Sequence, residues 1–270
     1  MAHSTDGCNC SKIAPSVFST IAISVSMNNK RGRLDRFLSR TLSISRNNLR
    51  PLLAAGRVRV NGDVINDPAF QIDEFSRIVV DADTRGETVL QQNTPLYLML
   101  NKPVGVVSAT RDDVHKTVLD LIDHPRKQEL HIVGRLDRNT SGLLLLTNDS
   151  RWSEKIMAPE AKVEKVYSVE LENDLSDEYV SAFAKGMYFP YENITTQPAV
   201  LEITGPKSAR VVLKEGKYHQ IKRMFGRFRN AVVRLHREKV GELELLDQTG
   251  QYLPRSHSCP IEPDAIWHQR

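Results

Sequence analysis

Hydrophobic positions are spaced differently in the first and the later parts of the chain. Over residues 33–56 they recur at intervals of three and four, which predicts two short helices, the second capped by Ser45. Gly56 ends the second helix, and Arg57 to Gly62 alternates like a strand that closes on an Asn-Gly turn. Residues 30–82 therefore form a compact helix-helix-strand module.

From residue 95 the pattern changes to short apolar strands that alternate with loops and a few helices. This irregular alternation predicts an α+β domain over residues 95–247, built on a mixed, mainly antiparallel sheet. The expected strands are Leu96–Leu100, Leu143–Leu146, Val166–Leu171, Val200–Ile203, Ala209–Leu213 and Val232–Leu235. The expected helices are Ser150–Met157, Ser176–Lys185 and Tyr218–Phe228.

The remaining segments lack such a pattern. Residues 83–94 are polar and contain Gly86, so we expect a linker. Residues 248–270 are polar and contain proline, which predicts a loose tail. Residues 1–29 are expected to be a disordered extension. No apolar run approaches the roughly 20 residues that a membrane helix needs, so no membrane association is expected.

The net charge is only +4, so the distribution of charge along the chain is more informative than its total. Residues 30–60 carry nine Lys or Arg against one acid, and residues 217–239 carry eight against one. One such cluster is explained by a solvated helix face, but two favour nucleic acid as the partner. The three cysteines lack zinc-site spacing, so no metal is expected, and reduced thiols suit the cytoplasm.

The most informative stretch for chemistry is Gly134 to Gly142, GRLDRNTSG, followed by LLLLTND. It places Asp137 between Arg135 and Arg138 in a glycine-bounded loop before a buried strand. Flanking cations would keep the carboxylate ionised, and the glycines let another backbone approach closely. On charge and spacing alone, the simpler interpretation is a structural aspartate that pairs with one arginine in a turn.

The stretch GRLDRNTSGLLLLTND closely resembles the signature of the ribosomal pseudouridine synthases, in the branch that modifies small-subunit (16S) rRNA. Residues 30–82 also resemble the RNA-binding module of the ribosomal protein S-four type that this family carries. The resemblance covers roughly residues 30–247. Three further segments match in the same order: LNKPVG at Leu100–Gly105, KVYSV at Lys165–Val169 and EGKYHQIKRMF at Glu215–Phe225.

A second Arg-Leu-Asp triplet, Arg33-Leu34-Asp35, is a decoy. It begins a predicted amphipathic helix, no glycine flanks it, and no buried strand follows. An aspartate also suits the positive end of a helix dipole, so we interpret Asp35 as part of a helix start.

The resemblance implies that the protein isomerises a uridine to pseudouridine in ribosomal RNA. The base is detached from ribose, turned over and rejoined through carbon, without redox change and without a cofactor. One ionised carboxylate is needed, and Asp137 matches the family nucleophile. The residues leave open whether it attacks the base, attacks the sugar or removes a sugar proton.

The resemblance also implies roles for the neighbours of Asp137. The target base must leave its stack, and Arg135 matches the position that fills the gap; alternatively it contacts phosphate or forms an ion pair. Tyr167 stacks on uracil and moves a proton, or only lines the inner face of a strand. Lys222 or Arg223 supplies the cation that pairs with Asp137, and family position favours Lys222.

The other candidates are expected to bind RNA. His219 and Gln220 are expected to order the basic helix or touch RNA rather than act as acid or base. The sequence Tyr218-His219-Gln220 also resembles the small-subunit branch rather than the large-subunit one. The predicted RNA contacts are Arg135, Arg138, Arg223, Lys102 and His219 in the catalytic domain, and Arg33, Arg36, Arg46 and Arg57 in the module.

The expected protein is thus a monomeric, cytoplasmic enzyme acting on small-subunit rRNA or an assembly intermediate. The alternatives are a large-subunit (23S) rRNA substrate and a non-catalytic ribosome-assembly factor. A nucleoside glycosidase would need two facing carboxylates. Asp149 is the nearby acid in the motif region, and it is predicted to cap the helix from Ser150 instead.

Overall fold

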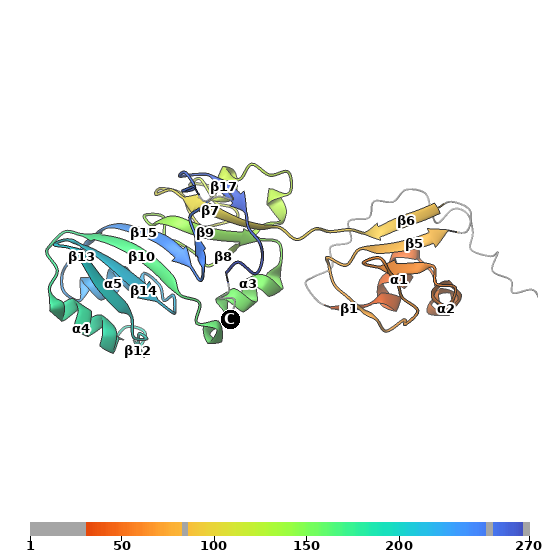
Figure 1. Ribbon diagram of the computed structural model, residues 1–270, viewed down its shortest axis with the longest axis horizontal. Coiled ribbons are helices and arrows are strands. Elements are labelled where there is room, and N and C mark those ends of the chain that lie inside the picture. The colour runs from red at the N-terminus through yellow and green to blue at the C-terminus, as the bar shows by residue number, and fades with distance from the viewer. Residues whose placement is uncertain (1–30, 83–85, 247–250, 267–270) are drawn as a thin grey trace, which may run out of the picture. The chain divides into compact units, whose positions relative to one another are not determined.

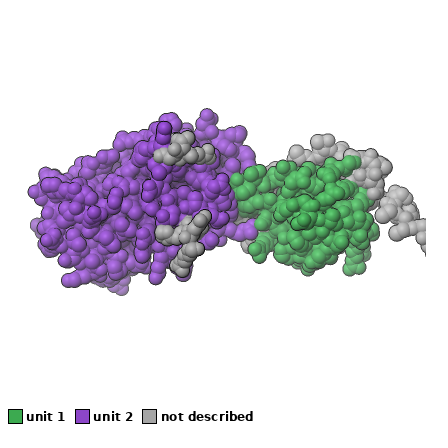
Figure 2. All heavy atoms as spheres, in the orientation of Figure 1, with its two compact units in different colours: residues 1–95 green, residues 96–270 purple. Residues whose placement is uncertain are grey.

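The computed structural model describes residues 31–82, 86–246 and 251–266. The chain divides into two compact units, residues 1–95 and residues 96–270 (Figure 2). Each unit has its own hydrophobic core. The extension expected at residues 1–29 lies outside the described residues.

Unit 1 packs two short helices against a small antiparallel sheet. Ser45 caps the second helix as predicted, because its hydroxyl accepts a hydrogen bond from the Asn48 amide. The helices bury leucines such as Leu38 and Leu49 against Val58 and Ile78 of the sheet. The helices are α1 (Leu34–Leu42) and α2 (Arg46–Ala54). The strands are β1 (Gly32–Arg33), β2 (Val58–Val60), β3 (Asp63–Val64), β4 (Gln71–Ile72), β5 (Ile78–Ala82) and β6 (Gly86–Gln91).

Strand β6 corrects the prediction that residues 83–94 are a linker. It pairs antiparallel with β5 and forms the edge of a sheet with order β3-β2-β5-β6. Gln91 is buried, and its amide donates to the carbonyls of Asp73 and Ser76. The strand is polar because most of it faces solvent at a sheet edge, so it shows no apolar alternation.

Unit 2 is built on a nine-stranded sheet whose main path is β13-β14-β10-β15-β9-β7-β17 (Figure 1). Its described strand pairs are antiparallel except for β9 and β15, which run parallel. The predicted α+β class with a mainly antiparallel sheet is therefore confirmed. The strands are β7 (Tyr97–Lys102), β8 (His131–Val133), β9 (Ser141–Thr147), β10 (Lys165–Leu171), β11 (Tyr188–Phe189), β12 (Ile194–Thr195), β13 (Val200–Gly205), β14 (Ser208–Leu213), β15 (Val232–Val240), β16 (Leu243–Glu244) and β17 (Ser258–Pro260).

The helices of unit 2 cover both faces of this sheet. Strand β9 is buried on both faces, which explains its run of four leucines. Leu144 and Leu146 join the core that contains α4 and α5, whereas Leu143 and Leu145 join the core that contains α3. The helices are α3 (Ser150–Met157), α4 (Asp177–Lys185) and α5 (Gln220–Gly226), with short 3₁₀ turns at Leu119–Leu121, Lys127–Glu129 and Pro159–Ala161.

The predicted loose tail at residues 248–270 is wrong for its described part. Strand β17 adds antiparallel to β7 at the sheet edge. The Pro263 carbonyl accepts a 2.7 Å hydrogen bond from the Trp152 indole, and Ile266 is buried in the core around α3. Long-range pairing of this kind leaves little trace in the local pattern of a polar segment.

Candidate active site

The loop that carries Asp137 connects β8 to β9 and is fixed to its surroundings on several sides. Ser108 donates its hydroxyl to the Leu136 carbonyl and accepts from the Leu136 amide, at 2.7 and 3.1 Å. Where the loop enters β9, Gly142 has φ +111°, and a Cβ there would lie 2.2 Å from the Arg237 carbonyl oxygen. Only glycine allows β15 to approach this closely, as expected for the glycines that bound this loop.

Lys102, predicted to bind RNA, is instead enclosed beneath this loop. Its side chain is fully buried. Its ammonium donates to the carbonyls of Pro103, Asp137 and Thr140 at 3.0, 3.1 and 2.8 Å. Burial lowers the pKa of Lys102 to about 8, although the charge of Asp137 acts in the opposite direction. A side chain with this placement holds the loop and cannot reach a phosphate.

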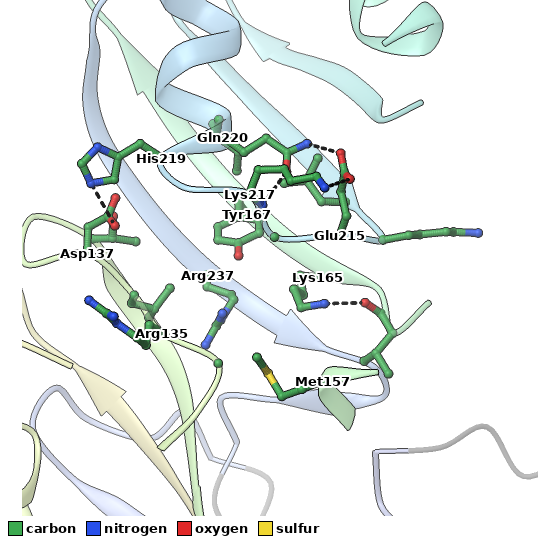
Figure 3. Close-up of a pocket in the computed structure, with 18 of the residues that line it drawn as sticks. Arg135, Asp137, Met157, Lys165, Tyr167, Glu215, Lys217, His219, Gln220 and Arg237 are labelled. Atoms are coloured by element: carbon green, nitrogen blue, oxygen red, sulfur yellow. Dashed lines mark hydrogen bonds and ion pairs between the residues drawn. The ribbon is translucent and has the colours of Figure 1, made fainter. Parts of the chain in front are cut away.

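Two side chains from the region of α5 contact the carboxylate of Asp137. The Lys222 ammonium lies 3.1 Å from Oδ2. The His219 Nε2 lies 3.2 Å from Oδ1, and Figure 3 shows this contact. The Asp137 side chain keeps 29% of its exposure, so it is held by its partners but open to the cleft. Of the two neighbours that the sequence left open, Lys222 is the one that faces the carboxylate.

Arg223 points elsewhere, because adjacent helix positions diverge. It forms an ion pair with Glu192 and lies over the Phe189 ring, 3.9 Å from its centroid. Its guanidinium also donates to the Tyr218 carbonyl at 3.3 Å. These contacts brace α5 against the β11–β12 hairpin, and the RNA contact of Arg223 stays a prediction.

Helix α5 begins two residues later than predicted, at Gln220, because His219 adopts a left-handed conformation with φ 49°. The side chain of buried Gln220 fixes this turn. Its oxygen accepts from the Lys217 amide at 2.9 Å, and its nitrogen donates to the Glu215 carboxylate at 2.8 Å (Figure 3). Gln220 therefore orders the helix start, one of the two roles expected for it, and His219 is aimed at Asp137.

The cleft in front of Asp137 has a volume of about 360 Å³. This lies within the roughly 300–1,000 Å³ range of small-molecule sites. Tyr167, on β10, is nearly buried and points into the cleft (Figure 3). Exposed Arg135 also lines it, whereas Arg138, likewise exposed, lies outside the lining and donates to the Gly105 carbonyl at 3.3 Å.

Two lining residues were missed as site residues. Lys165 donates to the Val163 carbonyl at 2.9 Å, and burial, followed by repulsion from Arg237, lowers its pKa to about 8. Arg237 is buried and donates from Nε to the Leu143 carbonyl at 2.7 Å. Lys165 stands in the matched KVYSV segment and Arg237 in the second basic cluster. Their place in these segments, rather than their residue type, was the signal that could have identified them as site residues.

The lining also bears on the glycosidase alternative. Its carboxylates are Asp137 and Glu215, which lie at opposite ends of the cleft (Figure 3). Glu215 is occupied by the Gln220 side chain and by the Gln197 amide at 2.8 Å. Asp149 caps α3 as predicted, accepting from the Arg151 and Trp152 amides. No second carboxylate among these lining residues is free to face the bond next to Asp137.

The module arginines divide into two groups. Arg33 pairs with Asp35 at the start of α1, in agreement with the interpretation of this triplet as a helix start. Arg57 is half-buried and donates to the Asp81 carbonyl, so its guanidinium braces the sheet rather than facing RNA. On α1 and α2, Arg36, Arg40, Arg46 and Arg50 are exposed and form no ion pair with another described residue.

Within residues 31–82, 86–246 and 251–266, no three His, Cys, Asp or Glu side chains are grouped so as to hold a metal ion. In the same ranges, no helix has the length and apolar character needed to cross a bilayer.

The fold and the site together are those of an enzyme with a cleft lined by basic side chains, in which the Asp137 carboxylate lies between a lysine and a histidine. The RNA pseudouridylate synthase family matches residues 96–226, and the S4 domain family matches residues 32–78. The chain therefore belongs to the RNA pseudouridylate synthase family, whose members are isomerases, and it carries an S4 domain.

Individual relatives agree with this assignment. The chain is 49% identical over 235 residues to the ribosomal small subunit pseudouridine synthase A of Pseudomonas aeruginosa, covering 87% of this chain and 98% of the relative. It is 41% identical over 213 residues to the protein of the same name from Escherichia coli, covering 79% and 90%. A crystal structure of a pseudouridylate synthase is 34% identical, covers 87% of this chain and 97% of its own, and superposes with a TM-score of 0.59.

Proposed function

We propose that the protein converts one uridine of small-subunit ribosomal RNA to pseudouridine, with Asp137 as the catalytic residue. The observation that carries this proposal is the Asp137 carboxylate, which is held by Lys222 and His219 and faces a cleft of nucleoside-binding size. The small-subunit substrate is supported by relatives of that name at 41–49% identity over most of the chain.

In this proposal the cleft residues divide the work of the reaction. Lys222 holds the Asp137 carboxylate in place, so that it can act on the nucleoside as the base is released. Tyr167 offers an aromatic face for uracil and a hydroxyl for proton transfer. Arg135, exposed at the cleft, takes the place of the nucleotide that leaves the stack.

Unit 1 contributes affinity rather than chemistry. The exposed arginines of α1 and α2 contact phosphate, which positions the RNA without reading its sequence. The proposed active form is a monomer. Because the proposed substrate is ribosomal RNA, the proposed place of action is the cytoplasm.

Pseudouridine mapping on four substrates tests this assignment: small- and large-subunit rRNA transcripts, and partly assembled small and large subunits. Each is incubated with wild-type protein or with Asp137→Ala. We expect one new pseudouridine in small-subunit rRNA, present with the wild type and absent with the variant. Modification confined to large-subunit rRNA would overturn the substrate assignment. No modification of any substrate would favour an assembly factor that lacks the reaction.

A further inference from the structure

Tyr218, the residue before His219, presents an exposed aromatic ring and lies in the chain between two residues that line the cleft. The rings of Tyr218 and His219 are stacked, with centroids 3.9 Å apart and planes inclined by 18°. Tyr218 is 73% exposed, so one face of its ring rests on His219 and the other is open to solvent. Lys217 and His219, its two chain neighbours, both line the cleft.

The stacked pair extends from the exposed Tyr218 ring to the Asp137 carboxylate. The edge of His219 remote from the backbone places Nε2 3.2 Å from the Asp137 carboxylate (Figure 3). A ring stacked on the open face of Tyr218 would therefore continue a column that ends beside the carboxylate. The mechanism above uses Lys222 and Tyr167 but gives Tyr218 no part.

The backbone that presents the pair is held on both sides. The left-handed turn at His219 is uncommon for a residue with a side chain and persists only when its surroundings fix it. On the inner side, Gln220 ties the turn to Glu215. On the outer side, the Tyr218 carbonyl accepts from Arg223, whose guanidinium lies over the Phe189 ring.

We propose that the open face of Tyr218 stacks on the nucleobase that flanks the target uridine, a role that rests on the proposed function. When a base is extruded, its neighbour loses a stacking partner, and an aromatic side chain at the cleft rim can replace that partner. Stacking of this kind accepts any base, so the site supplies affinity and position rather than sequence reading. His219 holds the Tyr218 ring in register with Asp137.

The test uses full-length protein and a small-subunit rRNA fragment that spans the mapped uridine. 2-Aminopurine replaces the nucleotide on either side in turn, and its fluorescence is read by stopped flow on the first binding event. The variants are Tyr218→Leu, Tyr218→Phe and, as a matched control, Tyr191→Leu, which changes another highly exposed tyrosine outside the cleft lining. Thermal unfolding of each variant verifies that it folds.

We expect quenching at one of the two positions with wild type, Tyr218→Phe and Tyr191→Leu, and none with Tyr218→Leu. Loss of the platform should also raise KM for the fragment about tenfold or more, with a smaller change in kcat. A merely structural tyrosine would leave the quenching and KM unchanged, and that result would overturn the inference. Equal rises of KM in Tyr218→Leu and Tyr191→Leu would overturn it as well.

Failure of the proposed function is recognised separately. If wild-type protein forms no pseudouridine in the parent rRNA, the substrate assignment itself has failed and no fragment can be chosen from it. If wild type modifies the fragment but neither 2-aminopurine is quenched, only the stacking role is lost.

Discussion

Cationic side chains in the two units differ in where they lie and in what they contact. On α1 and α2, Arg36, Arg40, Arg46 and Arg50 are exposed and form no ion pair with another described residue. In unit 2, two cations close to the Asp137 loop are buried: Lys102 donates to three carbonyls, and Arg237 donates to another.

The difference shows that burial rather than charge decides the role of a cation in this protein. An exposed arginine exchanges counterions for phosphate at little structural cost, so its contribution depends on salt. A buried ammonium must be satisfied inside the protein, and once satisfied it fixes the groups around it. The exposed arginines of α1 and α2 are therefore proposed to bind phosphate, whereas Lys102 and Arg237 hold the backbone around the site.

The largest expected effect comes from removing the buried charge of Lys102. Lys102→Met leaves three loop carbonyls without their donor, and we expect the free energy of unfolding to fall by about 3 kcal/mol. Denaturant unfolding measures this, with exposed Lys116→Met as a control that stays within about 0.5 kcal/mol. Weaker RNA binding with unchanged stability would mean that Lys102 contacts RNA after all.

The second comparison separates two neighbours on α5. Lys222→Met removes the cation beside Asp137, and we expect kcat to fall about hundredfold. Arg223→Met removes the pair with Glu192, the contact with the Phe189 ring and the donor to the Tyr218 carbonyl. None of these contacts involves Asp137, so kcat should change less than about fivefold. Single-turnover rates on the modified rRNA measure both. The reverse order of effects would show that Arg223 supplies the catalytic cation.

The exposed group is tested by changing Arg36, Arg40, Arg46 and Arg50 together to Gln. We expect the slope of log K against log salt to become shallower by up to roughly 3, at about 0.7 per phosphate contact, while kcat at saturating RNA is kept. Arg59→Gln is the control, because Arg59 pairs with Asp81 and Glu87 in the same unit. An unchanged salt slope would remove these arginines from the RNA interface.

The smallest expected effect concerns pH. Lys165 has a folded pKa of about 8, lowered from the ordinary value of 10.5 mainly by burial. Between these values the unfolded chain binds more protons than the folded one, so this group's contribution to stability rises as pH rises. The stability difference between wild type and Lys165→Met should therefore shift in favour of wild type from pH 8 to pH 10. A stability difference that stays constant across this range would contradict the depressed pKa of Lys165.

Local periodicity was enough to predict much of the fold. The two helices of unit 1, the boundaries of α3 and the buried strand β9 each follow from the spacing of apolar residues within their own segments. Strands β6 and β17 could not be predicted in this way. They are polar, and they become strands by adding to β5 and β7 at sheet edges.

Only part of the candidate site could be predicted, because some of its contacts depend on residues that are distant in the chain. Asp137, Tyr167 and Lys222 stand in matched motifs, and the structure brings all three to one cleft. The contact of His219 with Asp137 could not be predicted, because it depends on a left-handed turn fixed by a buried glutamine. Lys102 was misassigned because a lysine is exposed by default, and only the ring of carbonyls around it reverses that preference.

The central claim is that Asp137 performs the chemistry, and the most direct measurement is the single-turnover rate of pseudouridine formation by Asp137→Asn. Asp149→Asn is the matched control, since asparagine still caps α3. We predict no detectable product with Asp137→Asn, unchanged RNA binding, and a near wild-type rate with Asp149→Asn. A rate for Asp137→Asn within about tenfold of wild type, or about 1.4 kcal/mol of barrier, would contradict the account.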